Sequence, residues 1–166
     1  MKTPLFYVGT LDIIRNSGYK FNHTKEVMII FQYKRLSKSG FVGRIDMTIT
    51  KIEKNGIICA IVNSDDIVIA DAQSALDVLM TAKYDAGTKN IVISKKLIVE
   101  DFFILSSGLA GEILQKYINY GGRIAIYGDY SHYTSKPLHD FIYESNKGKD
   151  VFFVGTQEEA VDKLTQ

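Results

Sequence analysis

Short apolar runs alternate with amphipathic stretches from residue 47 onward, and this alternation constrains the fold more than any other feature of the sequence. The apolar runs occupy residues 57–62, 90–94, 123–128 and 151–154. Runs of this length are typical of buried strands, and strands separated by helical patterns form βαβ units. We therefore expect an α/β domain in which a mostly parallel or mixed sheet is covered by about four helices.

A strand hairpin is expected at the start of this domain. Residues 48–53 alternate between apolar and polar side chains, and Lys54-Asn55-Gly56 separates them from the apolar run at residues 57–62. An Asn-Gly pair between two such runs favours a tight hairpin turn, because both residue types tolerate positive φ angles. A further short apolar run covers residues 67–70.

Helical spacing marks two stretches in the middle of the chain. Residues 71–84 place apolar side chains at helical intervals behind Asp71, a residue type that caps helix starts well. A denser apolar stripe begins at Phe102 and continues to Tyr120. We expect a second helix there, ending at Gly121-Gly122.

Two further helices are expected near the carboxyl end. Ser135 suits the cap, and Pro137 the first turn, of a helix that closes at Lys147-Gly148. Thr156 and Glu159 stand three residues apart, as in a capping box, at the start of the last helix.

Composition indicates a soluble globular protein. Apolar residues make up 46% of the 166 residues and charged residues 23%, a balance that supports a core and is not typical of disordered chains. No apolar run approaches the roughly 18 residues that a membrane span needs, and the amino terminus lacks the features of a signal peptide. Cys59, the single cysteine, lies in an apolar strand and is expected to be a buried hydrophobe rather than a reactive thiol. We expect a cytoplasmic protein with no membrane partner.

Residues 1–46 fit the alternation poorly, so we interpret them as an appended segment that precedes a domain over residues 47–166. The segment carries eight Lys and Arg against three Asp and Glu, whereas the rest of the chain carries twelve against sixteen. Because the domain is acidic and no reading motif accompanies the basic segment, nucleic acid is not an expected partner.

Within the appended segment, short strands are expected at residues 5–8 and 27–33, and residues 37–43 resemble a linker. Met47 follows shortly after and could itself be a translation start. Mass analysis of the natively expressed protein would test this, since a product beginning at Met1 would contradict it.

Common catalytic and cofactor signatures are absent from the sequence. It contains no Gly-rich phosphate loop, no dinucleotide fingerprint after the first strand and no nucleophile elbow. His23, His132 and His139 share no spacing known from metal sites, and Cys59 is far from them along the chain. We therefore expect neither a metal nor a cofactor, and the sequence leans against an enzyme without excluding one.

Ser106-Ser107-Gly108 lies inside the apolar stripe and has two interpretations. If a helix starts directly after these residues, its backbone N–H groups and dipole would favour a phosphate on Ser107 or Ser106. If the helix starts earlier, near Glu100-Asp101, Ser107 and Gly111 would be small residues four apart that let a neighbour pack closely. Both interpretations remain open at this point.

A polar loop over residues 129–136 follows one of the predicted strands. Ligands of open α/β sheets bind beyond the carboxyl ends of strands, so this loop is the expected pocket. A ring could stack on its tyrosines, its lysine could meet an anion, and its aspartate or histidine could exchange protons. Alternatively, the loop is solvated and its tyrosines only cover the sheet edge. The candidate ligand- or partner-binding residues are Asp129, Tyr130, His132, Ser135 and Lys136.

Four segments carry a family resemblance: residues 71–77 (DAQSALD), 108–116 (GLAGEILQK), 133–136 (YTSK) and 140–146 (DFIYESN). On these segments the chain from Met47 to Leu164 resembles a bacterial family known as domain of unknown function 4180. The resemblance implies no known activity and does not extend to residues 1–46.

A more distant likeness is to STAS domains, the fold of anti-sigma factor antagonists. These domains look like a strand hairpin followed by strand–helix units, with Asp-Ser-Ser-Gly-Leu opening a helix. Residues 106–109 match the last four of those residues, which implies Ser107 as the equivalent of the phosphorylated serine. Leu105 stands where that family has Asp, and the linker from the preceding strand is longer.

Two functional hypotheses follow. The first is a regulatory module that binds an unidentified protein partner through the surface around the Phe102 helix and the 129–136 loop. Phosphorylation of Ser107 would then repel or misfit an acid-lined partner surface. The second is a small-molecule or nucleotide-binding protein, with or without enzymatic activity, that uses the 129–136 loop. A homo-oligomer held by Phe and Tyr side chains is a third interpretation.

Overall fold

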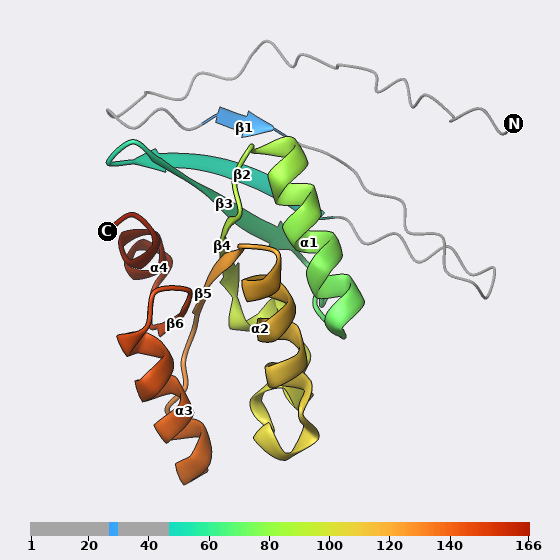
Figure 1. Cartoon of the computed structure of the whole chain (residues 1–166), viewed down its shortest axis with the longest axis vertical. Helices are drawn as coiled ribbons and strands as arrows, with labels where there is room; N and C mark the ends of the chain where they lie inside the picture. The colour runs from blue at the N-terminus through green and yellow to red at the C-terminus, as the bar shows by residue number, and fades with distance from the viewer. Residues whose placement is uncertain (1–26, 30–46) are drawn as a thin grey trace, which may run out of the picture.

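The computed structural model describes residues 27–29 and 47–166, in which six strands form one sheet in sequence order (Figure 1). The pairings β1–β2 and β2–β3 are antiparallel, and β3 to β6 pair in parallel. The predicted α/β fold, with its mixed sheet and strand hairpin, is confirmed. The strands are β1 (Val27–Ile29), β2 (Met47–Lys54), β3 (Ile57–Ser64), β4 (Asn90–Ser94), β5 (Arg123–Tyr127) and β6 (Val151–Val154).

The β2–β3 hairpin forms as the sequence predicts. Lys54 pairs with Ile57, so Asn55 and Gly56 alone make the turn. Their φ angles are 54° and 76°, which is the geometry of a type I′ turn and explains the Asn-Gly choice.

Strand β1 pairs with β2 and lies within the strand expected at residues 27–33. The strand predicted at residues 5–8 and the linker predicted at 37–43 lie outside the described residues. The domain boundary at residue 47 stays a prediction.

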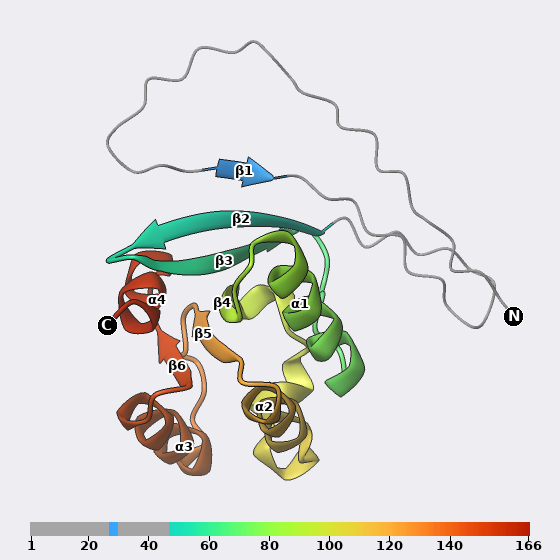
Figure 2. The same ribbon diagram turned by 45° about the horizontal axis from the view of Figure 1, so that its top comes forward.

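Four helices in the described part of the chain cover the two faces of the sheet: α1 (Ala72–Asp85), α2 (Leu109–Asn119), α3 (Lys136–Lys147) and α4 (Gln157–Leu164). Helices α1, α2 and α3 pack on one face, and α4 packs on the other (Figure 2). Right-handed crossovers between neighbouring parallel strands place successive helices on the same face, which accounts for the first three.

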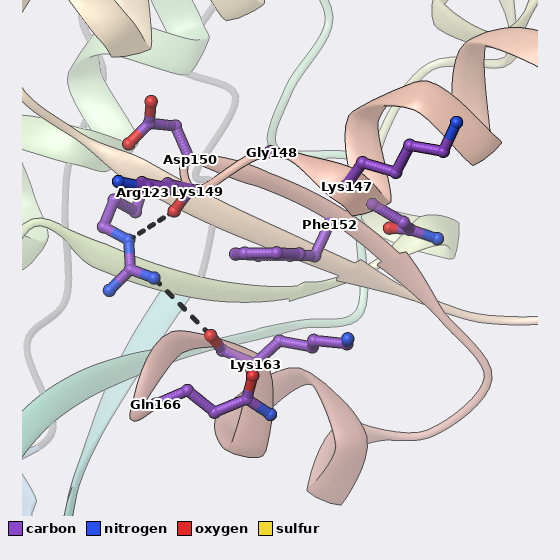
Figure 3. Close-up of a pocket in the computed structure, with 9 residues that line it drawn as sticks. Arg123, Lys147, Gly148, Lys149, Asp150, Phe152, Lys163 and Gln166 are labelled. Carbon is purple, nitrogen blue, oxygen red and sulfur yellow. Dashed lines mark hydrogen bonds between the residues drawn. The ribbon is translucent and has the colours of Figure 1, made fainter.

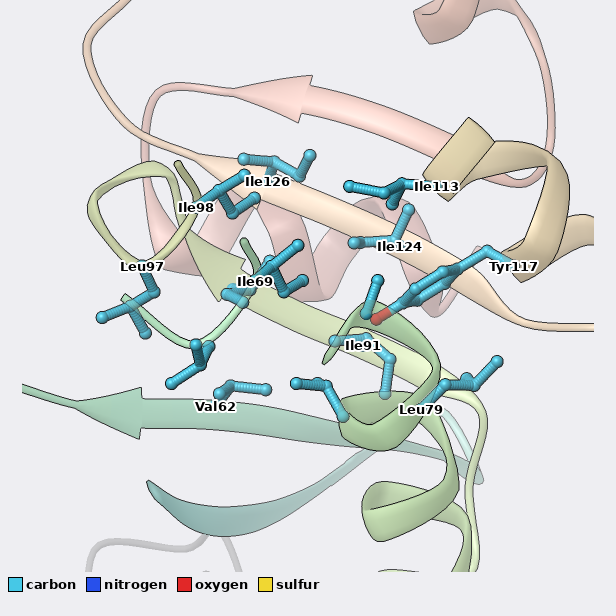
Figure 4. Close-up of a cluster of buried hydrophobic side chains, with 14 of the residues drawn as sticks. Val62, Ile69, Leu79, Ile91, Leu97, Ile98, Ile113, Tyr117, Ile124 and Ile126 are labelled. Carbon is cyan, nitrogen blue, oxygen red and sulfur yellow. The ribbon is translucent and has the colours of Figure 1, made fainter. Parts of the chain in front are cut away.

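The larger core lies between the sheet and α1–α3 (Figure 4). Alternate residues of β4 and β5 point into it, as the two-residue period of a strand requires. Helices α1 and α2 pack their apolar side chains against these strand residues. Its central members, each at most 1% exposed, are Leu79, Ile91, Ile93, Ile113, Tyr117, Ile124 and Ile126.

A smaller core lies under α4. Cys59, with no exposed surface, belongs to it, so the expectation of a buried cysteine is confirmed. The other members of this smaller core are Ile61, Val92, Ala125, Phe152, Ala160, Val161 and Leu164.

The helix expected from Phe102 onward begins later than predicted. Residues 100–103 and 105–107 form two short 3-10 turns, and α2 starts only at Leu109. Gly108 has a φ of +77°, a left-handed conformation that separates the second turn from the helix. Phe102 is nevertheless buried, because the spacing of three residues that suggested a helix also suits a 3-10 turn.

Most predicted helix ends are confirmed. Asp71 caps α1 in a capping box with Ser74, and Thr156 caps α4 in one with Glu159. Helix α2 ends in a Schellman motif, in which Gly121 has a φ of +67° and donates to the Ile118 carbonyl at 2.9 Å.

Ser135 departs from the prediction. It stands at the N-cap position of α3, but its side chain makes no capping hydrogen bond to that helix. Pro137 in the first turn supplies the preset φ angle instead.

Candidate functional site

Ser107 lies on the exposed turn directly before α2. Its hydroxyl donates to the Asp101 carbonyl oxygen at 2.8 Å and accepts from the Leu109 N–H at 3.2 Å. The hydroxyl therefore ties the first 3-10 turn to the first residue of the helix. Ser106 is exposed on the same turn.

The position of α2 bears on the two interpretations of this serine. The helix begins after Ser107 rather than near Glu100, so the hydroxyl stands at a helix start. A Cβ placed on Gly111 would meet no atom within 4 Å, and the residue is exposed. The close-packing explanation for a Ser107–Gly111 pair is therefore wrong.

A second cluster lies at the carboxyl ends of β4 and β5, where Lys95 follows β4. This Lys95 cluster consists of Lys95, Phe103, His132 and Tyr133. The Lys95 Nζ lies 3.4 Å from Nε2 of His132. It also lies 4.6 Å from the ring centre of Tyr133 and 5.5 Å from that of Phe103. Both rings can stabilise the ammonium by cation–π attraction, and no described carboxylate forms an ion pair with it.

Gly128 lets the chain after β5 approach Lys95. A Cβ at Gly128 would lie 2.8 Å from the Lys95 Cβ, and its φ of +159° disfavours other residues. The close approach fixes the backbone at the start of the 129–136 loop beside β4.

Glu100 links this cluster to the turn that carries Ser107. Its carboxylate accepts the Tyr133 hydroxyl at 2.6 Å. Burial of Tyr133, together with this neighbouring carboxylate, raises the pKa of the Tyr133 hydroxyl. Because Asp101 holds Ser107 and its neighbour Glu100 holds Tyr133, one 3-10 turn joins the two candidate regions.

Asp129 is exposed, and its carboxylate accepts the Ser131 N–H at 2.8 Å. This hydrogen bond lowers the pKa of Asp129, and the neighbouring His132 and Lys95 side chains act in the same direction. A carboxylate, an imidazole and an ammonium therefore lie close together, and such a set can bind a polar ligand or exchange protons with it.

Three other candidate residues of the loop have local roles. The Tyr130 hydroxyl donates to the Ile126 carbonyl at 3.0 Å, and its ring packs edge-on against Phe153. Lys136 forms an ion pair with Asp140 on the solvent side of α3. Ser135 is exposed beside it. The structure therefore gathers Asp129 and His132 but not Lys136.

Sequence reasoning missed Lys95 and Glu100. Lys95 is 37 residues from His132 along the chain, and Glu100 is 33 residues from Tyr133. The available signal was position alone, since Lys95 directly follows a predicted strand and the carboxyl ends of parallel strands share one edge.

Residues 27–29 and 47–166 contain neither a metal-binding cluster nor a membrane-spanning helix. No group of three or more His, Cys, Asp or Glu side chains there is arranged to hold a metal ion. None of the helices in residues 47–166 is long and apolar enough to cross a membrane.

Comparison with known proteins identifies the family. A family described as a domain of unknown function, DUF4180, matches residues 54–164. The chain belongs to this family. No curated protein and no solved structure matches the chain. The STAS likeness of this DUF4180 domain is therefore not confirmed and stays a prediction, and the membership of the family brings no activity with it.

Proposed function

We propose that this chain is a cytoplasmic regulatory module that binds another protein through the Ser107 turn, defined as residues 104–108. The observation that carries the proposal is that the exposed Ser107 hydroxyl holds the turn to the start of α2. A modification of this hydroxyl would change the shape of the surface around it.

Phosphorylation has a clear physical consequence at this position. The modified oxygen would no longer carry the proton that it donates to the Asp101 carbonyl. Nearly two negative charges would be added beside the exposed Asp101 carboxylate, while the N–H groups at the start of α2 would attract the phosphate. We expect the turn to rearrange and the partner to be released.

Ile104 is the residue that we expect to contact the partner. This side chain is 49% exposed, although the neighbouring Phe102 and Phe103 are buried. An exposed large apolar residue on a turn next to a modifiable serine suits a partner that presents an apolar contact.

Two measurements test the module. Phosphopeptide mapping of the natively expressed chain should find phosphate on Ser107. A photo-crosslinking residue at position 104 should give a discrete protein adduct that S107E abolishes and S106A preserves. Tyr84, which is 83% exposed on α1, is the matched control position. Equal adducts from both positions, or no effect of S107E, would contradict the proposal.

A second candidate function is supported by the Lys95–His132 contact. We propose it as the binding of a small polar ligand at the carboxyl ends of β4 and β5, with Asp129 and His132 available for proton exchange. Saturation with a ligand at a hundredfold excess over Kd should stabilise the fold by about 2.7 kcal/mol.

A thermal-shift screen of nucleotides and metabolites tests the second function. A stabilising compound should lose its effect in K95M and keep it in K96M, because Lys96 is an exposed neighbour that makes no contact with His132. A flat response across the library, or equal loss in both variants, would rule this function out and leave the protein-binding module.

A further inference from the structure

A basic hollow lies at the opposite edge of the sheet from the Lys95 cluster. Figure 3 shows the residues that line it. The hollow forms where the amino ends of β5 and β6 meet the carboxyl ends of α3 and α4, and its volume is about 650 Å³. This volume lies within the range of roughly 300–1,000 Å³ that is usual for small-molecule sites.

Cations dominate the lining of this hollow. Arg123, Lys147, Lys149 and Lys163 line it, and Asp150 is the acidic residue among the lining side chains. Lys147 forms an ion pair with Glu144. The other three cations form no ion pair with any described residue, so their charge is available to an anion.

Arg123 holds the hollow together. Its Nε donates to the Lys149 carbonyl at 2.8 Å, and its Nη1 donates to the Leu164 carbonyl at 2.8 Å (Figure 3 shows the first of these bonds). A third contact, from Nη2 to the Lys163 carbonyl, is 3.5 Å long. The guanidinium is therefore fixed between the segments that end α3 and α4, and it retains N–H donors that no carbonyl uses.

Phe152 supplies the apolar wall. Arg123 lies 5.9 Å and Lys163 lies 6.0 Å from the centre of its ring. Figure 3 shows the ring edge-on between Arg123 and Lys147, with Lys163 on the neighbouring helix. Cation–π attraction to the Phe152 ring can therefore orient Arg123 and Lys163, although neither has a carboxylate partner among the described residues.

We propose that this hollow binds a phosphorylated small molecule, with phosphate oxygens on Lys149, Lys163 and the remaining N–H groups of Arg123. Lys149 and Lys163 stand on the two segments that Arg123 joins, so rotation of their side chains would bring N–H donors from both segments to the several oxygens of a phosphate group. The hollow is a local basic feature, because residues 47–166 carry twelve Lys and Arg against sixteen Asp and Glu. A long polyanion would therefore meet acidic surface beyond the hollow, which favours a small ligand over nucleic acid.

Calorimetric titration of the full chain with pyrophosphate and with ATP tests the proposal. Saturable one-to-one binding of either probe is expected. The double variant K149Q/K163Q should weaken it by about a hundredfold or more, because it removes two charge-assisted hydrogen bonds to the phosphate. Arg123 is left unchanged because its carbonyl contacts support the fold.

The matched control is K83Q/K116Q, which removes the same charge from α1 and α2, at positions that do not line the hollow. It should leave the affinity within about twofold of the native chain. The variant K95M should also bind normally, which separates this hollow from the Lys95 cluster. Failure of both probes to saturate, or an equal loss in the two double variants, would overturn the proposal.

Discussion

The Lys95 Nζ and the His132 Nε2 lie 3.4 Å apart, and a lysine ammonium can only donate a hydrogen bond. His132 must therefore offer Nε2 as an acceptor and carry its proton on Nδ1. The reverse holds for His139, whose Nε2 lies 2.7 Å from the Tyr133 carbonyl oxygen. A carbonyl only accepts, so Nε2 of His139 must carry the proton.

Opposite tautomers of these two histidines are the first prediction. Long-range ¹H–¹⁵N spectra at about pH 8, where an ordinary histidine is neutral, should show a protonated Nδ1 in His132 and a protonated Nε2 in His139. The variant K95M should remove the preference in His132 and leave His139 unchanged. The same tautomer in both rings would contradict the contact.

The buried Tyr117 and the half-buried Tyr130 should respond oppositely to removal of the hydroxyl. The Tyr117 hydroxyl is fully buried in the larger core and has no hydrogen-bond partner among the described residues. The Tyr130 hydroxyl donates to Ile126. An unsatisfied buried polar group costs about 1–3 kcal/mol, whereas a satisfied one contributes about 1 kcal/mol.

Urea unfolding of Y117F and Y130F measures this difference. Y117F should raise the free energy of unfolding by about 1 kcal/mol, and Y130F should lower it by about 1 kcal/mol. Each variant serves as the control for the other, because both replace Tyr by Phe. Destabilisation by Y117F would show that its hydroxyl has a partner.

The three helix caps should also differ. Asp71 and Thr156 accept backbone N–H groups of their own helices, while Ser135 makes no capping bond. We expect D71A and T156A each to lower the free energy of unfolding by about 1 kcal/mol, and S135A to change it by a few tenths at most. A large loss in S135A would restore the capping role that the sequence suggested.

Features whose partners lie within four residues were predictable from sequence. The Asn55-Gly56 turn, the Asp71 cap and the Thr156–Glu159 box each depend on neighbouring atoms and on residue types with strong local preferences. The order of strands and helices was predictable for the same reason, because the spacing of apolar residues that marks a strand or a helix is visible within a single segment.

Features that depend on distant residues were not predictable. The Lys95 cluster combines side chains more than thirty residues apart, and no local pattern marks the lysine. The apolar spacing predicts too early a start for α2, because spacing alone cannot separate a 3-10 turn from an α-helix. Ser135 has the right residue type for a cap, but the rotation of its side chain is decided by the fold around it.

Cys59 gives the last prediction, which concerns pH. Burial raises the pKa of its thiol from 9.0 to about 11, although the charge of Arg123 acts in the opposite direction. Between these values the unfolded chain releases the thiol proton and the folded chain keeps it. The unfolded state then binds fewer protons, so the free energy of unfolding falls as pH rises from about 9 to 11.

The variant C59A tests this mechanism. It is less stable overall because it leaves a small cavity, but it should lack the part of the decline between pH 9 and pH 11 that the thiol causes.

Iodoacetamide labelling is a second test of the buried thiol. At neutral pH, iodoacetamide should label native Cys59 only as fast as the protein opens, because the thiolate is the nucleophile and the folded state suppresses formation of the thiolate. Labelling should therefore accelerate in low urea. A fast rate that urea does not change would instead identify an exposed, reactive thiol and contradict its place beneath α4.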